Sequence, residues 1–236
     1  MEFTKIAAPS LKDLFVQQLE EKILSGELEV GSKLPPEREL ADLMKVSRAV
    51  VNGGINELNR KGFLEVRPRQ GTYVADYSRN GNLQTLIALL EYRGNKLDKG
   101  GIRAILEVRG ALEHLAVGLV IDTASDLELN QLEMTAKELR DTETHYKAAQ
   151  VAFQYHHELA YLAGNTVLTL IYSSFKEVCI VLWVRFCKLY GIEALFDNVF
   201  TLHGYLRKRD TQGAYRWIQH YLGEAIDGSQ QIYEEV

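Results

Sequence analysis

The chain has 236 residues, of which 46% are hydrophobic, and a formal net charge of −5. This length allows one large or two small domains, and the apolar share is large enough to fill their cores. The sequence contains no apolar run as long as a membrane span, and the polar start Met1–Lys5 lacks the form of a signal peptide, so a globular, cytoplasmic protein without membrane contact is expected.

The first predicted helix runs from Leu11 to about Ser25. Ser10 is a suitable N-cap, and Asp13, three residues later, is an approximate capping-box partner. The apolar residues at four-residue spacing give this helix one hydrophobic face, which is expected to pack under two later helices: Leu11, Phe15, Leu19 and Ile23.

A proline start and a serine cap predict the next two helices. Residues 34–41 open a short helix, because proline is preset for the first turn and the carboxylates there interact favourably with the helix dipole. Residues 44–47 form a turn, and Ser47 caps a second helix that runs through Leu58 and is stopped by Gly62. The first exposed residues of that second helix would face the major groove of a duplex: Arg48, Ala49 and Asn52.

Two short strands follow. Phe63–Val66 and Thr72–Val74 show the alternation of a β-hairpin, and the tip Arg67–Gly71 offers cations, a turn and close backbone approach to phosphates or a minor groove. Together with the preceding helices, this hairpin completes a winged helix-turn-helix, so the sequence predicts DNA binding.

The polar, helix-breaking residues 77–81 are expected to link a DNA-binding domain at residues 1–76 to a second domain at residues 82–236. Beyond the linker the helical period dominates and no strand alternation of any length occurs. Ser125 with Glu128 caps one of these helices, and Gly164-Asn165 and Gly191 act as stops. Helices are predicted around residues 83–90, 102–119, 146–163, 167–190, 195–207 and 211–233. The expected fold is mainly α, with a small β wing and a C-terminal bundle of six or seven helices.

These residues resemble the GntR family of bacterial transcription regulators, and within it the FadR-like subgroup. The segments that match are Leu34–Ala41, Val46–Arg48, Gly62–Leu64 and the wing Arg69–Val74, with a weaker likeness at Glu107–Arg109, Glu113 and Ala163–Asn165. The resemblance implies a homodimer that binds an inverted-repeat operator in double-stranded DNA, and a helical domain whose small-molecule effector changes DNA affinity; a repressor is expected. It maps Arg38, Arg48 and Arg69–Gly71 onto DNA contacts. The candidate DNA-binding residues are Arg38, Ser47, Arg48, Ala49, Asn52, Arg69, Gln70 and Gly71.

The negative net charge is compatible with DNA binding because the charge is unevenly distributed. Between Lys45 and Tyr73 there are six cations and two carboxylates, a local charge of +4. A mixed solvated surface also produces such an excess, so the prediction depends on the motif.

The predicted recognition helix departs from the resembled family at Asn52-Gly53-Gly54. The family usually has arginine, glutamate and alanine there. Asn52 can pair with adenine but has a shorter reach than arginine, so a different half-site and a lower affinity are expected. Two glycines cost roughly 1–2 kcal/mol of helix stability relative to alanine, unless close packing or a bend offsets this. We therefore expect a soft helix, which Gly53→Glu with Gly54→Ala would stabilise.

The effector site is predicted from buried polar residues. Arg109 lies on an otherwise apolar helix face, so it needs either an anionic ligand or an internal salt bridge with Glu113 or Glu107. His156 is either a hydrogen-bonded core histidine or a ligand contact. Tyr172 belongs to an aromatic group that is mostly core but contributes to a pocket. The candidate effector-binding residues are Arg109, His156 and Tyr172.

No metal and no other cofactor is expected. Many members of the resembled family bind a divalent cation with an aspartate and three histidines, but this chain has Ala152, His156, Val199 and Tyr221 at those positions. The effector is therefore expected to be an organic anion or acyl-CoA-like. The acyl-CoA-responsive type is, however, expected to have small or aromatic residues at helix-end positions that here read Leu222, Ala225 and Ser229. The alternative is a metal-assisted carboxylate sensor with a rearranged site that uses His203 and His220.

The sequence does not favour an enzyme. Residues 157–161 begin like a zinc-protease helix, but the second histidine is replaced by Tyr161, and no phosphate loop or nucleophile elbow is present. Cys179 and Cys187 lie in an apolar stretch and are expected to be buried free thiols without redox function. A further alternative is a structural DNA-binding protein that responds to no effector.

Overall fold

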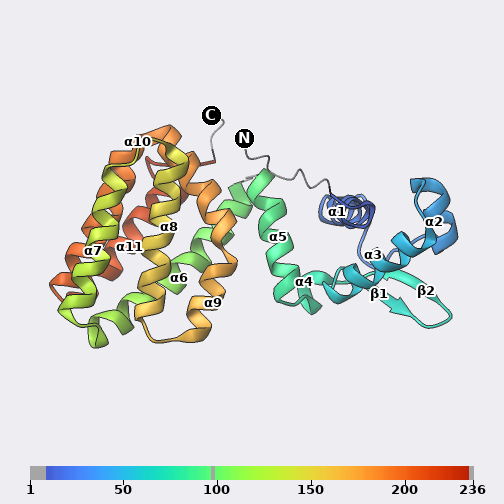
Figure 1. Cartoon of the computed structure of the whole chain (residues 1–236), viewed down its shortest axis with the longest axis horizontal. Helices are drawn as coiled ribbons and strands as arrows, with labels where there is room; N and C mark the ends of the chain where they lie inside the picture. Colours follow the sequence, from blue (N-terminus) through green and yellow to red (C-terminus); the bar gives the residue numbers. More distant parts are fainter. Residues whose placement is uncertain (1–8, 97–98, 234–236) are drawn as a thin grey trace, which may run out of the picture. The chain divides into compact units, whose positions relative to one another are not determined.

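The computed structural model describes residues 9–96 and 99–233. The chain divides into two compact units, one ending at Tyr92 and the other beginning at Arg93 (Figure 1). The start Met1–Lys5, on which the absence of a signal peptide was predicted, lies outside the described residues.

The first helix, α1 (Leu11–Leu24), starts as predicted. Ser10 accepts a hydrogen bond from the Asp13 backbone, and the Asp13 side chain accepts one from the Ser10 backbone, so the capping box is present. The buried face consists of Phe15, Val16, Leu19 and Ile23. Leu11, which the spacing placed on this face, is exposed because it lies in the first turn, at the edge of the contact.

The helix-turn-helix consists of α2 (Glu37–Met44) and α3 (Arg48–Arg60). Lys45 ends α2 in the left-handed conformation, and the Ser47 side chain accepts a hydrogen bond from the Val50 backbone at the start of α3. The predicted turn and cap are confirmed, and α3 continues two residues beyond the predicted end at Leu58.

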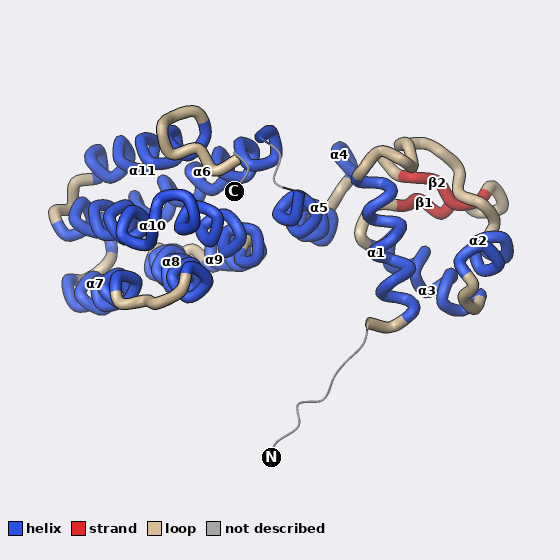
Figure 2. The backbone as a smooth tube through the Cα atoms, turned by 90° about the horizontal axis from the view of Figure 1, so that it is seen from above, coloured by secondary structure: helices blue, strands red, loops and turns tan. Residues whose placement is uncertain are grey.

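The wing is an antiparallel pair of strands, β1 (Leu64–Arg67) and β2 (Gly71–Val74), with Leu64 opposite Val74. Residues 31–34 lie along the other edge of β2, where Gly31 donates to the Val74 carbonyl and Leu34 donates to the Thr72 carbonyl. Figure 2 shows the two strands within the otherwise helical N-terminal unit.

Residues 77–81 do not form a simple linker, because most of them belong to a short helix, α4 (Tyr77–Asn80). The next helix, α5 (Leu83–Lys96), begins against the end of α3: Asn82 donates to the Arg60 carbonyl at 2.9 Å, and Thr85 donates to the Lys61 carbonyl. Ala88 joins the core of the first unit. These contacts explain why the division between the units falls after Tyr92 rather than at residues 77–81.

The second unit contains α6 (Lys99–Thr123), α7 (Asp126–Arg140), α8 (His145–Leu162), α9 (Thr166–Ser174), α10 (Lys176–Arg207) and α11 (Thr211–Ile226). α8 lies among α6, α7, α9 and α10, while α11 packs against α6 and α10. The predicted all-helical bundle is thus confirmed, including the capping box of Ser125 and Glu128.

Three helix boundaries differ from the prediction. The segment 167–190 is broken at Phe175, and helical hydrogen bonding continues across the predicted stop at Gly191, where φ is 88° and the helix axis bends. The last helix ends at Ile226 rather than near Tyr233. There Glu224 accepts hydrogen bonds from the backbone and hydroxyl of Ser229, which turns the chain out of the helix.

Both cysteines are buried and free, as predicted, and burial raises the pKa of each thiol to about 12. Among the described helices, none is by itself long and apolar enough to cross a membrane. The bent pair α9 and α10 meets the length and composition criterion only when taken together.

Candidate DNA-binding surface and effector pocket

The α3 helix is seated closely on α1, and Gly54 makes this approach possible. A Cβ atom at position 54 would lie 2.6 Å from Cε1 of Phe15 and closer still to Cδ1. Phe15 is 1% exposed, so its ring fills the space beside the glycine. Close packing was the exception to the expectation of a soft helix, and Gly54 meets it, because the Phe15 ring occupies the place of the missing side chain. Gly53 differs, since its Cβ would meet only Lys12 Cδ at 3.5 Å, an ordinary contact.

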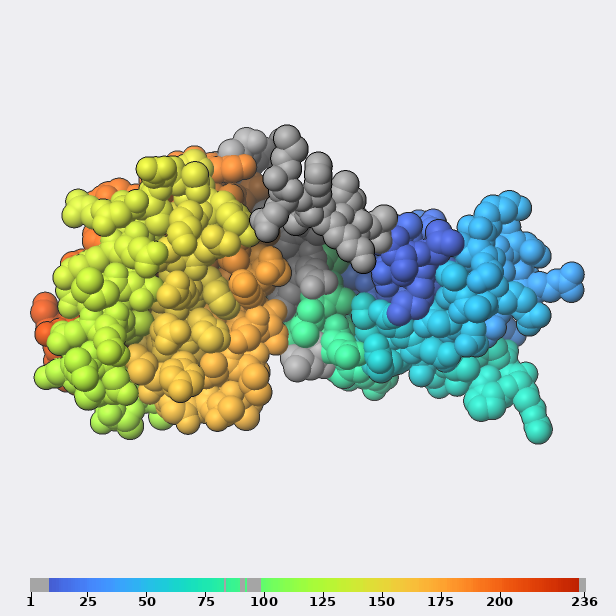
Figure 3. Space-filling view, in the orientation of Figure 1, coloured from blue at the N-terminus to red at the C-terminus, as the bar shows by residue number. Residues whose placement is uncertain are grey.

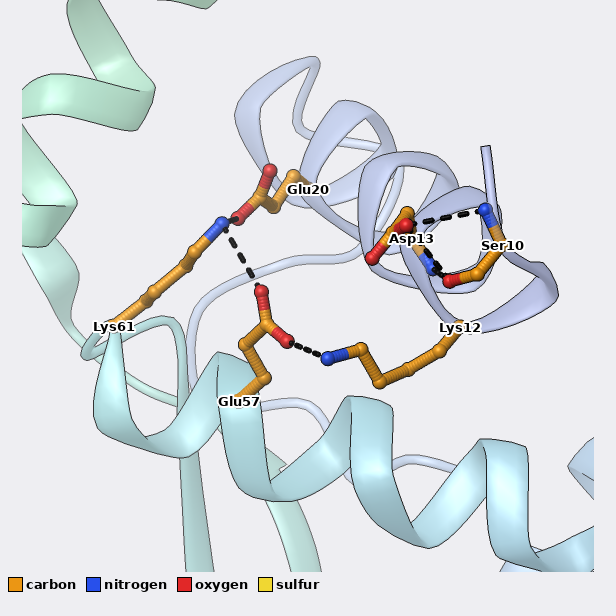
Figure 4. A network of polar contacts seen from close by, with 6 residues as sticks. All are labelled: Ser10, Lys12, Asp13, Glu20, Glu57 and Lys61. Atoms are coloured by element: carbon orange, nitrogen blue, oxygen red, sulfur yellow. Dashed lines mark hydrogen bonds and ion pairs between the residues drawn. The ribbon is translucent and has the colours of Figure 1, made fainter. Parts of the chain in front are cut away.

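A polar network fastens the same two helices together (Figure 4). Lys61 Nζ lies 2.9 Å from Glu20 Oε1 and 3.7 Å from Glu57 Oε1, while Lys12 Nζ lies 2.8 Å from Glu57 Oε2. The hydrogen bond from Lys12 lowers the pKa of the Glu57 carboxyl. Two of these ion pairs, Lys12 with Glu57 and Lys61 with Glu20, hold the C-terminal end of α3 to α1, while the pair of Lys61 with Glu57 lies within the end of α3 itself.

The N-terminal half of α3 presents its other face to solvent. Arg48, Ala49 and Asn52 are all exposed, in agreement with the predicted groove-facing positions. The Asn52 amide donates to Glu37 Oε1 at 3.3 Å and accepts from Asn56 at 3.0 Å. These bonds lie on the surface, so water or a base edge can replace them.

The tip of the wing projects from its unit in the space-filling view (Figure 3). Arg69 adopts a left-handed backbone with φ of 61°, and both Arg69 and Gln70 are exposed. Gly71 has φ of 120°, and a Cβ atom there would lie 2.7 Å from Lys33 Cε. The positive φ therefore favours glycine at position 71, while the end of the flexible Lys33 side chain is able to move aside, and the sequence pattern did not predict this backbone conformation.

The structure sorts the basic residues of the first unit into two groups. Lys61 is paired with Glu20 and Glu57, and Arg67 lies 2.8 Å from Glu65 and stacks over the Tyr73 ring. Six other cations form no ion pair within the described part of the unit: Lys33, Arg38, Lys45, Arg48, Arg60 and Arg69. The unpaired cations of α2, the turn, the start of α3 and the wing tip are therefore available for phosphates.

The second unit contains a pocket of about 450 Å³, its open mouth included. Nine of its lining residues are apolar or aromatic, and the other four are Arg109, His156, Asn198 and Tyr221. The residues come from α6, α8, α10 and α11 and from the segment after α11: Leu106, Arg109, His156, Leu182, Trp183, Phe186, Leu195, Asn198, Val199, Tyr221, Leu222, Ala225 and Ile232. Such a combination of an apolar body with a few polar groups is typical of a small-molecule site.

Arg109 pairs with Glu113, one of the two partners that the sequence suggested. Arg109 Nε lies 2.6 Å from Glu113 Oε1, both side chains are buried, and the Tyr221 hydroxyl donates to Glu113 Oε2. Burial opposes both charges, but their mutual attraction outweighs it: the pKa of the guanidinium is raised and that of the carboxyl is lowered. The guanidinium carbon also lies 4.3 Å from the centre of the Trp183 ring.

His156 is neutral in this environment. Burial lowers its pKa, although Glu113 Oε1 lies 3.6 Å from Nε2. Its Nδ1 is 2.8 Å from the Ala152 carbonyl, so Nδ1 carries the proton and Nε2 faces the carboxylate. Tyr172 stacks on the His156 ring but does not line the pocket, and its buried hydroxyl has no protein partner within the described residues.

Val199 and Tyr221, identified from sequence spacing as the positions of two absent histidines, line the same pocket as His156. The residues proposed to replace those histidines do not join them. His203 lies beside Tyr155 and Glu133, and His220 lies against Trp217. Within residues 9–96 and 99–233, no group of three or more His, Cys, Asp or Glu side chains could hold a metal ion.

About half of the pocket wall was not identified from the sequence. Nothing in the sequence marked Trp183, Asn198 or Ile232 as residues that line a pocket. The spacing of Arg109 and Glu113, four residues apart on one helix, was the only local signal of this network.

Two family models match the chain. Residues 12–74 match the model described as bacterial regulatory proteins, gntR family, and residues 104–224 match the FCD domain. The first match covers α1 through the wing, and the second covers the helices that line the pocket.

Curated relatives match over part of the chain. The transcriptional regulator Mce2R of Mycobacterium tuberculosis is 36% identical over 46% of this chain and 45% of its own length. LutR of Bacillus subtilis is 29% identical over 62% of this chain and 65% of its own length, and an uncharacterized regulator of Escherichia coli, YieP, is 29% identical over 73% and 76%. The alignment thus spans about half of the first relative and about two thirds of the second.

A solved structure described as Lar, which controls expression of the Listeria monocytogenes agr system, has the same fold. It superposes with a TM-score of 0.60 at 15% identity, covering 95% of this chain and 98% of that one. At this identity the likeness concerns the fold alone.

Proposed function

The chain belongs to the gntR family of bacterial regulatory proteins and has an FCD domain, and we propose that it is a transcription regulator whose affinity for an operator is changed by a small organic effector. Its DNA-binding surface is the exposed start of α3 with the wing tip, and its effector site is the pocket among α6, α8, α10 and α11. A protein that acts on the bacterial chromosome works in the cytoplasm.

The observation that supports operator binding is the separation of paired from unpaired cations. Lys61 and Arg67 form ion pairs within the first unit. Arg48, in contrast, is exposed and forms no ion pair among the described residues, and it lies in the first turn of a helix whose other face packs on α1. A side chain in that position can reach a guanine edge with two hydrogen bonds, a contact worth about 1–3 kcal/mol of discrimination.

The test is selection of duplexes from a random pool, followed by fluorescence-anisotropy titration of the selected sequence. Arg48→Ala should lose about 10- to 100-fold in affinity for the selected duplex and relax its sequence preference. Arg79→Ala removes an exposed cation of α4 that belongs neither to the start of α3 nor to the wing tip, and this control should bind as wild type. Equal binding by Arg48→Ala and wild type would refute the placement of α3 in the groove.

For the effector we propose an organic anion with an apolar body, bound without metal. The ion pair with Glu113 uses Nε of Arg109, and a further side-chain hydrogen bond joins Arg109 to Tyr221, so the remaining N–H groups of its terminal nitrogens are the donors for a carboxylate or phosphate at the polar end of the pocket. The apolar lining accommodates the rest of the ligand, and an acyl-CoA-like compound is one member of this class.

A thermal-shift screen of organic acids, nucleotides and acyl-CoAs tests this proposal, because a ligand that binds only the folded state raises its melting temperature. A hit should be repeated with Trp183→Leu, which removes a pocket wall, and with Cys187→Ala, a buried residue of the same helix that does not line the pocket. Binding that survives Trp183→Leu unchanged would place the ligand elsewhere.

We propose further that the regulator binds an inverted repeat as a homodimer and that the effector lowers its operator affinity, as in a repressor. Helix-turn-helix proteins read two half-sites through two-fold symmetry. Sedimentation of the protein with the selected duplex gives the stoichiometry. An affinity that no pocket ligand changes would favour the alternative of a structural DNA-binding protein.

A further inference from the structure

One wall of the pocket is built differently from the rest. Every lining residue but one lies on α6, α8, α10 or α11, whereas Ile232 belongs to the segment 227–233, which follows the end of α11 and is not helical. Ile232 is 3% exposed, so its side chain fills space inside the second unit. Figure 2 draws the segment as a loop beside the start of α6.

The backbone of this segment is held firmly at its start and more loosely at its end. Asp227 and Gly228 donate to the Gly223 carbonyl at 2.9 and 3.1 Å, and Ser229 donates to the Glu224 carboxylate at 2.7 Å. Further along, Gln230 donates to the Glu224 carbonyl at 3.2 Å and Ile232 to the Ala225 carbonyl at 3.3 Å, at the upper limit of normal length. The helical walls are each held by a continuous ladder of hydrogen bonds. Segments with weak backbone bonds and few buried apolar groups open at the lowest free energy, so the end of this segment, with Ile232, is the part of the pocket wall that is easiest to displace.

Side chains connect the segment to two helices. From α10, the Tyr190 hydroxyl donates to the Gln231 carbonyl at 2.7 Å, and Arg185 Nε donates to the Ile232 carbonyl. From the start of α6, Arg103 Nη2 contacts both carboxylate oxygens of Asp227, at 2.6 and 2.5 Å.

Lys99 adds two contacts in the first turn of α6. Its Nζ lies 3.8 Å from Asp227 and 4.7 Å from the centre of the Tyr233 ring. The segment therefore touches the pocket through Ile232 and the beginning of α6 through its two ends.

We propose that residues 227–233 are a gate over the effector pocket and that the contacts of Asp227 with Arg103 and Lys99 are its latch on α6. A ligand that enters the pocket displaces Ile232, and the displacement breaks the latch. The inference rests on the proposed effector site and names how that site is regulated. It differs from that proposal because it concerns the movement of the wall, not the chemistry of the ligand.

The position of the latch at the beginning of α6 connects opening of the gate to that helix. The second unit begins at Arg93, in the last turn of α5, and α6 is the first helix that lies wholly within it, so the beginning of α6 follows closely on the point where the chain passes between the units. Arg109 of the pocket lies on the same helix, six residues after Arg103. Opening of the gate thus changes what holds the beginning of α6 while the ligand occupies its middle.

The gate is tested by quenching of Trp183, the pocket tryptophan, with acrylamide in a Trp217→Phe background, which leaves Trp183 as the only tryptophan of the chain. Trp183 is 4% exposed in the closed pocket, and its quenching should be weak. Asp227→Ala should raise the quenching constant about two- to fivefold. The matched control is Asp126→Ala, which breaks another exposed aspartate–arginine pair, with Arg209 at 2.9 Å, and should leave quenching unchanged.

Ionic strength gives a second readout. Because exposed ion pairs weaken as salt screens them, quenching of the parent should rise with salt concentration, whereas Asp227→Ala should be insensitive. Ile232→Gly should open the pocket without touching the latch and raise quenching at every salt concentration. Circular dichroism first establishes that each variant is folded.

Coupling to α6 is measured by amide hydrogen exchange in its first three turns. Ile232→Gly should accelerate exchange there several-fold, and α7 should exchange as in wild type. Quenching that is unchanged in both Asp227→Ala and Ile232→Gly would overturn the gate, and unchanged exchange in α6 would overturn the latch. Neither measurement uses DNA or an effector, so either failure is distinguishable from failure of the proposed regulator function.

Discussion

Two adjacent glycines of α3 provide a matched pair of substitutions with opposite predicted outcomes. Gly53→Ala and Gly54→Ala add the same methyl group to the same helix. Each change should gain up to about 1 kcal/mol of intrinsic helix stability. The two positions differ only in what the new Cβ meets.

At position 53 the Cβ meets Lys12 Cδ at 3.5 Å, an ordinary contact with a flexible side chain. Gly53→Ala should therefore stabilise the first unit by roughly 0.5–1 kcal/mol. At position 54 the Cβ would lie 2.6 Å from Phe15 Cε1, and the ring is 1% exposed and cannot swing into solvent. Overpacking costs about 1–3 kcal/mol, and a contact this short belongs to the upper half of that range, so Gly54→Ala should be destabilising by about 1–2 kcal/mol once about 1 kcal/mol of helix propensity is subtracted.

The assay is chemical denaturation of the full chain, followed by two signals. Both tryptophans, Trp183 and Trp217, belong to the second unit, so fluorescence reports on that unit alone, while far-UV circular dichroism reports on both. The unfolding transition of the first unit is obtained by subtracting the transition seen by fluorescence from the one seen by circular dichroism. Phe15→Leu combined with Gly54→Ala should recover part of the loss, with a coupling free energy of roughly 0.5–3 kcal/mol.

If Gly54→Ala stabilises the protein as much as Gly53→Ala, the packing argument is wrong and the original expectation of a merely soft helix is restored. If both are destabilising, α3 needs two glycines for a reason other than the Phe15 contact. Operator affinity should follow stability only weakly, because neither methyl group reaches the exposed face of α3.

Three further predictions concern the DNA surface, the ion pair and pH. Asn52→Arg should tighten binding to a guanine-containing inverted repeat relative to wild type, which anisotropy measures; unchanged affinity would mean that position 52 does not face the groove. Arg109→Met should lower the free energy of unfolding by about 3–5 kcal/mol because it leaves the buried Glu113 carboxylate unpaired, and adding Glu113→Leu should recover most of this loss. Denaturation followed by tryptophan fluorescence measures both variants, and an equal loss in the two would count against the ion pair. His203 is buried and its pKa is lowered from 6.5 to about 4, so the unfolded chain binds its proton first as pH falls. The free energy of unfolding should therefore fall by up to roughly 3 kcal/mol as the pH is lowered from 6.5 to about 4, and His203→Gln should reduce this fall. Identical pH profiles of stability for the variant and wild type would refute this role of His203.

Local patterns of residues were sufficient to predict several elements. The capping boxes at Ser10 and Ser125, the Ser47 cap and the turn at the wing tip depend on hydrogen bonds between residues three apart, and such bonds form wherever the residue types and spacing permit them. The same locality made the winged helix-turn-helix recognisable and placed Arg48 on its exposed side. It also offered Glu113 as a partner of Arg109, one turn away on the same helix.

Contacts between residues that are distant in the sequence became visible only in the folded chain. Gly54 looked like a weakness of α3 until Phe15 of another helix was found in its place, and the pocket joined α6 to residues more than seventy positions later along the chain. The end of α11 and the burial of Ile232 were likewise invisible, because no periodic pattern marks a single apolar side chain in a non-helical segment. Packing contacts depend on how helices distant in sequence come to lie together, and residue spacing carries no information about that arrangement beyond one helical turn.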